Sequence, residues 1–354
     1  MEILNVITLS IPIFFLMIGT EIAVDIYKKT KTYRVNDSIS NLTAGVLQQS
    51  YGFVAAAIRA AVFAACYTYF GIFKDIFTAD KWWVWIGMFF LVDFVYYWFH
   101  RASHRIALLW TGHVVHHQSE EYNLTVALRQ SILQGIYSAP WIAIYGVLGI
   151  DYKVVVVSMG LNTVLQFWVH TQHIDKLPRW LEYFLNTPSH HRVHHGRNPQ
   201  YIDKNYAGAL IIWDRMFGTF EPEKEKVVFG ITVAPKTWNP FYGQFSTLRD
   251  LTQTARQRGF KNGIRTLLHP PGWCPENDTI DLSFENREKY DPIIPKAKTV
   301  LALGIFTSAT VMVSYYLFQI THLSMGVKIA LIAISSIALY LVGKLLDQAN
   351  RESI

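Results

Sequence analysis

Several apolar stretches of this chain are long enough to cross a lipid bilayer, and they limit the possible folds more than any other feature. A spanning helix needs about 20 mostly apolar residues, and its backbone polar groups must all be paired within the protein. Residues 3–22 meet this condition, and further candidates occupy 42–73, 82–99, 300–320 and 327–346. Only 16% of the residues are charged, against about 25% in soluble domains, which also favours a membrane protein.

Two more apolar segments, 132–150 and 154–169, are separated by three residues. So short a connection predicts a helical hairpin over 132–169, which either crosses the membrane or returns to the side from which it entered. The sequence therefore predicts an all-α integral membrane protein with a bundle of about five to seven spans. Asp93 lies within the third span, where an ionisable group is costly, and either serves the functional site or makes a buried contact between helices.

The basic residues after the first span predict the orientation. Lys28, Lys29 and Lys31 follow that span, and short loops rich in lysine and arginine stay in the cytoplasm. Three regions result: 1–99 as N-terminal transmembrane helices, 100–297 as a catalytic region with the hairpin and a cytoplasmic helical cap, and 298–354 as a C-terminal transmembrane pair.

Eleven of the thirteen histidines fall in four short clusters, all predicted on the cytoplasmic side. Spacings of three and four residues place side chains on one face of a helix, and neutral imidazole is a ligand for iron, zinc, copper and nickel. Eleven such groups are too many for one ion and suit a dimetal site. The clusters read His100-Arg-Ala-Ser-His104, His113-Val-Val-His116-His117, His170-Thr-Gln-His173 and His190-His191-Arg-Val-His194-His195.

Other uses of such clusters fit less well. A zinc hydrolase of the His-Glu-x-x-His type needs a glutamate between its ligands, and none is present. A transporter would place ionisable groups along a path within the spans, and a structural zinc site needs only four ligands. Nucleic-acid binding would need a basic run interleaved with aromatic residues, and the sequence contains none. Two irons held by imidazoles can reduce dioxygen and attack unactivated C–H bonds, which lipid tails offer at the bilayer surface.

The order His-x-x-x-His, His-x-x-His-His and a later His-x-x-His-His resembles the fatty acid hydroxylase/sterol desaturase superfamily of membrane di-iron oxygenases. Residues 113–131, 186–220 and 271–273 are most similar to its alkylglycerol monooxygenase branch. The resemblance implies an iron-dependent lipid monooxygenase or desaturase with two Fe²⁺ ions and O2 as co-substrate. A lipid substrate, the membrane and a separate electron donor are the implied partners; the donor is a cytochrome b5-like or ferredoxin-like protein or a reduced pterin.

Hydroxylation of an ether lipid is the first expectation. The alternatives are a sterol desaturase of the C-5 type, a fatty acid hydroxylase and, more remotely, a metal-binding or transport membrane protein without catalysis. The resemblance also implies roles for Asp214 and Asn123 as residues that support catalysis, Asp214 by orienting a histidine ring unless it forms an ordinary salt bridge. His190 is implied as either a ligand or a hydrogen-bond donor beside the site. The implied metal ligands are His100, His104, His113, His116, His117, His170, His173, His190, His191, His194 and His195.

Overall fold

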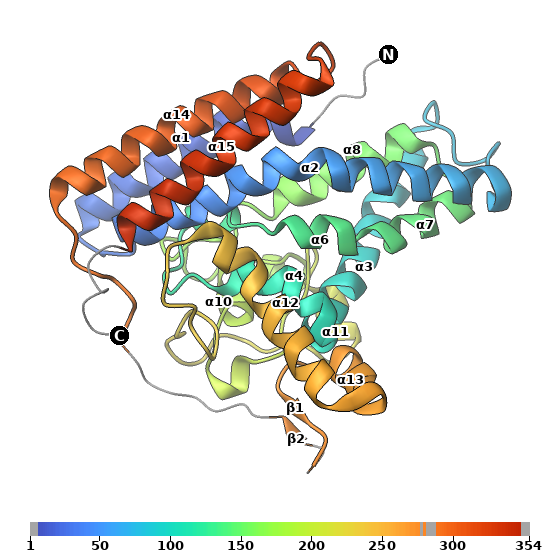
Figure 1. Ribbon diagram of the computed structural model, residues 1–354. Coiled ribbons are helices and arrows are strands. Elements are labelled where there is room, and N and C mark those ends of the chain that lie inside the picture. The colour runs from blue at the N-terminus through green and yellow to red at the C-terminus, as the bar shows by residue number, and fades with distance from the viewer. Residues whose placement is uncertain (1–5, 277–278, 281–287, 348–354) are drawn as a thin grey trace.

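The computed structural model describes residues 6–276, 279–280 and 288–347. Figure 1 shows long helices stacked above a group of short helices and loops. Within the described residues, the strands form one two-stranded antiparallel sheet, β1 (Trp273–Cys274) with β2 (Thr279–Ile280). The prediction of an all-α fold is therefore confirmed.

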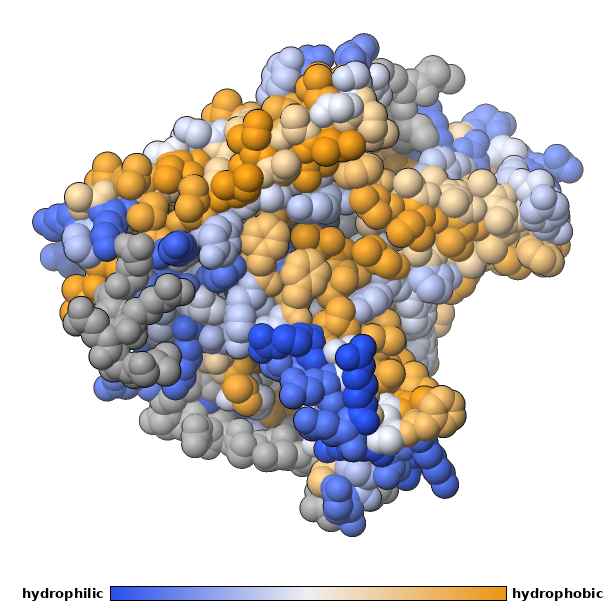
Figure 2. All heavy atoms as spheres, in the orientation of Figure 1, coloured by the Kyte–Doolittle hydropathy of each residue, from blue (hydrophilic) through white to orange (hydrophobic). Residues whose placement is uncertain are grey.

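Five helices in the described part of the chain are long and apolar enough to cross a membrane. The chain is thus a multi-pass membrane protein, and the count lies at the lower end of the predicted range. Residues 3–5 of the first predicted span lie outside the described residues. Figure 2 shows apolar side chains covering this bundle and hydrophilic ones gathered below it. The five are α1 (Val6–Lys28), α2 (Val35–Phe70), α3 (Trp82–Arg105), α14 (Lys296–Phe318) and α15 (Met325–Leu346).

The predicted hairpin forms three short helices, α6 (Ile132–Tyr137), α7 (Ala139–Leu148) and α8 (Tyr152–Leu165). A proline in the first turn of α7 cannot donate a backbone hydrogen bond, so the helix breaks between α6 and α7. Each helix is shorter than the roughly 20 residues that a span requires. The hairpin instead packs on α2, where a Cβ on Gly146 would lie 2.9 Å from the carbonyl oxygen of Phe63.

The remaining elements form the cap below the bundle (Figure 1). Their bounds are α4 (Ala107–His117), α5 (Leu124–Ala127), α9 (Arg179–Phe184), α10 (Pro188–His194), η1 (Pro199–Tyr201), α11 (Ile212–Met216), α12 (Pro240–Gln257) and α13 (Gly259–Leu268). Most of them are short, and α12 is the longest, with 18 residues.

Asp93 joins the cap to the bundle. Its fully buried carboxylate accepts hydrogen bonds from the backbone N–H groups of Ala209 at 2.6 Å and Leu210 at 3.0 Å. It also accepts from the side chains of Asn162 in α8 and Trp213 in α11. Four donors satisfy a carboxylate that would otherwise be very costly at this depth. The structure therefore supports a buried contact between elements as the role of Asp93.

A second buried carboxylate, that of Glu21, ties α1 to the segments that carry two of the histidine clusters. It accepts a hydrogen bond from the backbone N–H of Leu124 at 2.8 Å. The hydroxyl groups of Thr171 and Tyr33 also donate to it. Because Thr171 follows His170 directly, this contact fixes the backbone beside one of the candidate ligands.

Candidate metal centre

Nine buried histidines gather in two groups where α3 enters the cap. Within each group the candidate ligand nitrogens all lie within 4.8 Å of one another. The structure thus brings together nine of the eleven histidines that the sequence suggested. The first group is His100, His104, His113, His117 and His194, and the second is His116, His170, His191 and His195.

Each His-x-x-His-His motif sends its first and last histidines to one group and its middle histidine to the other. In α4, His113 and His117 are one helical turn apart and join the first group, whereas His116 joins the second. In the later motif the groups are exchanged: His194 joins the first group, and His191 and His195 join the second. Each motif therefore spans both groups, which makes the two candidate sites neighbours.

The outer nitrogens of these rings fix their tautomers. Where Nδ1 meets a backbone carbonyl, Nδ1 must carry the hydrogen, because a carbonyl oxygen only accepts. Nε2 is then unprotonated and presents its lone pair to the centre of the group, as a metal ligand requires. These contacts are His100 with Tyr206 at 2.8 Å, His116 with Arg129 at 3.1 Å, His170 with Gln166 at 2.9 Å and His194 with Lys204 at 3.0 Å.

Where both tautomers are fixed in this way, the inner nitrogens face one another without a hydrogen between them. The Nε2 atoms of His116 and His170 are 3.2 Å apart, yet both rings hold their hydrogen on Nδ1. Two facing lone pairs repel unless a cation lies between or beside them. The Nε2 atoms of His104, His194 and His195 are also buried without a hydrogen-bond partner. The donor set fits two metal ions that accept neutral nitrogen ligands.

Burial keeps these rings neutral. It lowers the pKa of His113 and His170 to about 4 and that of His194 to about 3. For His195, burial and the neighbouring rings together hold the pKa well below its ordinary value. A neutral imidazole is the form that binds metal, so the histidines are ready to coordinate at neutral pH.

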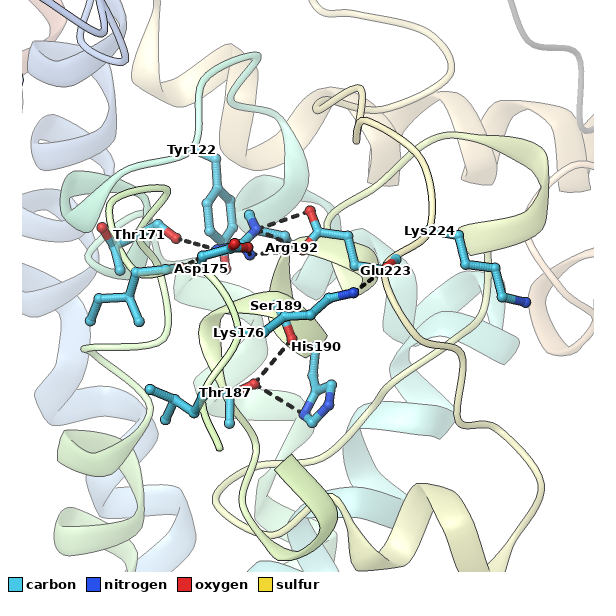
Figure 3. A network of polar contacts seen from close by, with 12 residues as sticks. Tyr122, Thr171, Asp175, Lys176, Thr187, Ser189, His190, Arg192, Glu223 and Lys224 are labelled. Carbon is cyan, nitrogen blue, oxygen red and sulfur yellow. Dashed lines mark hydrogen bonds and ion pairs between the residues drawn. The ribbon is translucent and has the colours of Figure 1, made fainter. Parts of the chain in front are cut away.

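His190 and His173 lie outside both groups. The Nε2 of His190 is 3.0 Å from a carboxylate oxygen of Glu182. Its Nδ1 is 3.3 Å from the hydroxyl of Thr187, and Figure 3 shows this second contact. Burial alone would raise the pKa of Glu182, but hydrogen bonds from His190 and its neighbours lower it to about 2. The Nε2 of His173 lies 3.7 Å from Asp25.

Arg192 connects two of the histidine segments, and sequence reasoning gave it no such role. Its buried guanidinium pairs with Glu223 at 2.7 Å. It also donates to the backbone carbonyls of Thr171 at 3.1 Å and Ile174 at 2.7 Å, and Figure 3 shows it between these partners. The contact holds α10 against the segment that carries His170. No spacing pattern identifies such a residue, because its partners are about twenty to thirty positions away.

Asp214 and Asn123 both contact backbone groups rather than histidine rings. Asp214 accepts hydrogen bonds from the N–H groups of Tyr206 and Ala207, each at 2.8 Å, and so fixes the peptide whose Tyr206 carbonyl receives the His100 hydrogen. Burial raises the pKa of Asp214 to about 6. Asn123 caps α5, accepting from the N–H of Thr125. Within the described residues, Asp214 makes these backbone contacts instead of the arginine salt bridge that was its alternative.

Arg129 supports His116 and was also missed. Its carbonyl accepts the His116 hydrogen, and its buried guanidinium donates to the carbonyl of Val115 at 2.7 Å and to Gln118 at 2.7 Å. The side chain therefore anchors its own backbone against α4. An arginine beside an apolar segment was the only available signal in the sequence.

Two cavities reach the histidines and share no lining residue. One, of about 270 Å³, touches His113, His116, His170 and His191 and is otherwise lined mainly by apolar residues of α1, α2 and α14. Gln130, Gln134 and Gln166 add amide groups near the histidine wall. The other, of about 170 Å³, touches His104, His117, His194 and His195, together with Trp110, Arg197 and Asp203, so that His100 is the one grouped histidine lining neither cavity. The first cavity is largely apolar, and the second, which we call the polar cavity, is the more polar of the two.

Comparison with known proteins agrees with this geometry. Residues 85–219, which include all nine grouped histidines, match the fatty acid hydroxylase family model. The chain is 37% identical to human alkylglycerol monooxygenase over 363 residues, covering 100% of this chain and 80% of the human protein. It is 40% identical to the Xenopus tropicalis enzyme of that name over 287 residues, covering 79% of this chain and 63% of the frog protein. Mouse lathosterol oxidase is 27% identical over 146 residues, covering 38% and 44%. No solved structure was found to match the chain.

Proposed function

Because this chain belongs to the fatty acid hydroxylase family, we propose that it is a membrane-bound, di-iron, O2-dependent lipid monooxygenase of the alkylglycerol monooxygenase type. The observation that carries this proposal is the pair of buried histidine groups whose Nε2 lone pairs converge beside an apolar cavity. The relatives named for alkylglycerol align along most of the chain, whereas the sterol relative aligns with 38% of it. Ether-lipid hydroxylation is therefore favoured over sterol desaturation.

The nine grouped histidines are the proposed iron ligands, five for one ion and four for the other. His173 and His190 are proposed to support the structure around the site instead, since the Nε2 atom of each faces a carboxylate, that of Asp25 or Glu182. When bound, two iron ions supply the activation of O2 that breaks an unactivated C–H bond. Backbone carbonyls already hold four of these rings in the ligand tautomer, which reduces the reorganisation needed when metal binds.

The apolar cavity is the proposed lipid site. Phe14 of α1, Val313 and Leu317 of α14 provide apolar walls for an alkyl chain, and Gln134 and Gln166 provide hydrogen-bonding groups beside the histidines. An alkylglycerol has this same division, with a long chain and a hydroxyl-bearing end joined by an ether oxygen. Exclusion of water by the apolar walls would protect the reactive centre.

The polar cavity is the proposed approach for reducing equivalents from a separate donor. It reaches the histidines without crossing the lipid cavity, because the two have no lining residue in common. A cytochrome b5-like or ferredoxin-like protein, or a reduced pterin, would each satisfy the requirement for electrons.

The cap is proposed to face the cytoplasm. Arg34, beyond the basic loop after α1, lies 2.6 Å from Glu121 of the cap, so that loop and the cap share one side of the membrane. Short loops rich in lysine and arginine are retained in the cytoplasm.

The proposal is tested by feeding cells alkylglycerols and sterols together and comparing the wild type with His191→Ala and His194→Ala, with and without O2. These changes remove one candidate ligand from each group. His322→Ala, an exposed histidine between α14 and α15, is the matched control. An O2-dependent hydroxylated ether lipid lost only in the two site variants is expected. A sterol product instead would reassign the substrate, and no lipid product from a metal-loaded protein would overturn the oxygenase.

A further inference from the structure

Four large apolar side chains of the cap are exposed in one patch. Trp180, Tyr183 and Phe184 project from α9 at positions i, i+3 and i+4, which share one helical face. Met216 of α11 belongs to the same patch, because α9 and α11 are hydrogen-bonded: the N–H of Ile211 donates to the carbonyl of Phe184 at 3.0 Å. All four side chains are more than half exposed. We call them the α9–α11 patch.

The depth of this patch follows from the contact between α3 and two aromatic residues at α11, next to Met216. The Phe94 ring lies 5.1 Å from that of Trp213 and 6.2 Å from that of Phe217, which flank or belong to α11. Phe94 is twelve residues after Trp82, the first residue of α3, or about 18 Å along the helix axis. The hydrocarbon core is about 30 Å thick, and any tilt of α3 shortens the depth covered. Phe94 and the side chains against it therefore lie at bilayer depth.

The other face of α9 is bound to α10, the helix that carries His191 and His194. Glu182 lies between the aromatic positions, and its carboxylate holds His190 at 3.0 Å and accepts from the hydroxyl of Ser189 at 2.9 Å. Arg215 covers the Tyr183 ring at 4.8 Å and donates to the Glu182 carbonyl at 3.0 Å. A short amphipathic element thus presents aromatics outward and anchors the histidine helix inward.

We propose that the α9–α11 patch inserts into the cap-side leaflet of the membrane, so that lipid acyl chains and the interface cover it. Continuity with the membrane-facing surface of α3 identifies lipid as the occupant, and tryptophan and tyrosine are the side chains enriched at the bilayer interface. Arg179, exposed and adjacent to Trp180 in the sequence, is placed to meet headgroup phosphates. This inference does not depend on the reaction that the centre performs.

The test uses the full chain in lipid nanodiscs, with Cys66→Ala and Cys274→Ser removing the native thiols and a fluorescent label on one new cysteine at a time. Trp180→Cys, Phe184→Cys and Met216→Cys report on the patch. Ile86→Cys, on the exposed side of α3 at 53%, is the lipid-facing control, and Val233→Cys, an apolar cap residue at 80%, is the water-facing control.

Brominated phosphatidylcholine is expected to quench the three patch labels to within about twofold of the Ile86 label, while aqueous iodide quenches only the Val233 label. Patch labels that follow the Val233 label would overturn the proposal. A second result would also overturn it, namely patch labels that are shielded from both quenchers, but only in discs that hold two copies of the chain. In that case a second chain would cover the patch.

Discussion

The Nε2 atom of His190 lies 3.0 Å from the carboxylate of Glu182, and this contact holds the ring outside both histidine groups even though its neighbour His191 belongs to one. Adjacent residues on a helix differ by about 100° in direction, so two consecutive histidines rarely serve one ion. The pair therefore offers a direct test of which rings bind metal.

His191→Ala is expected to lower the iron content of the purified protein from about two ions per chain, because it removes one of four nitrogens from the second group. His190→Ala and His173→Ala are expected to retain both ions, since neither ring joins a group. Elemental analysis of each variant provides the measurement. Metal loss in His190→Ala equal to that in His191→Ala would mean that the ligand set has been assigned incorrectly.

Asp214→Ala is expected to reduce lipid turnover by about 10- to 100-fold, the usual effect of removing a group that orients a metal ligand. The change frees the N–H groups of Tyr206 and Ala207 and releases the carbonyl that binds His100. Iron retention under a chelator should fall in parallel. Asp250→Ala, an exposed aspartate of α12, serves as the control and should leave both properties unchanged. Normal chelator resistance in Asp214→Ala would contradict this positioning role.

Ser314→Phe is expected to lower turnover of long-chain ether lipids by about tenfold or more, because it fills the apolar cavity and displaces the alkyl chain. Iron content should stay normal, since Ser314 lies in α14, which carries none of the candidate ligands. Ser308→Phe adds the same ring to an exposed position of the same helix and controls for effects on membrane insertion. Turnover and chain-length preference are measured in detergent. Wild-type values of both in Ser314→Phe would contradict the cavity assignment.

The metal-free protein is expected to lose stability as the pH falls from 7 to 5. The pKa values of His113 and His170 are about 4 in the folded state, whereas an unfolded histidine has a pKa near 6.5. Between these two values, each group changes the free energy of unfolding by up to about 1.4 kcal/mol per pH unit. Between these values the unfolded chain binds more protons, so the free energy of unfolding rises with pH. Thermal unfolding in detergent across this range measures the effect, and a midpoint independent of pH would show that the rings are not held neutral.

Helical periodicity explains why much of the centre was predictable from the sequence. His113 and His117, one turn apart, had to point the same way whatever the rest of the fold. The departure of His190 depends instead on Glu182, whose position is set by the path of the chain between two short helices. The break at the start of α7 reflects one proline within an apolar run, which hydrophobicity alone does not register.

Long-range supports escaped prediction for a different reason. Arg129 acts on His116 through its own carbonyl, and Arg192 acts on the His170 segment through backbone oxygens. Such contacts use groups that every residue carries, so no residue pattern marks them. Asp214 was expected to orient a histidine ring directly. It instead binds the N–H of Tyr206, and the carbonyl of Tyr206 orients the His100 ring.

The walls of the lipid cavity come from the two ends of the chain, Phe14 in α1 and Leu317 in α14. During synthesis the histidine segments leave the ribosome well before α14 does. All nine candidate ligands can therefore be in place while the cavity beside them still lacks one wall. Insertion of the last helical pair completes the wall of the cavity. The cavity therefore forms only after the candidate metal ligands have been synthesised.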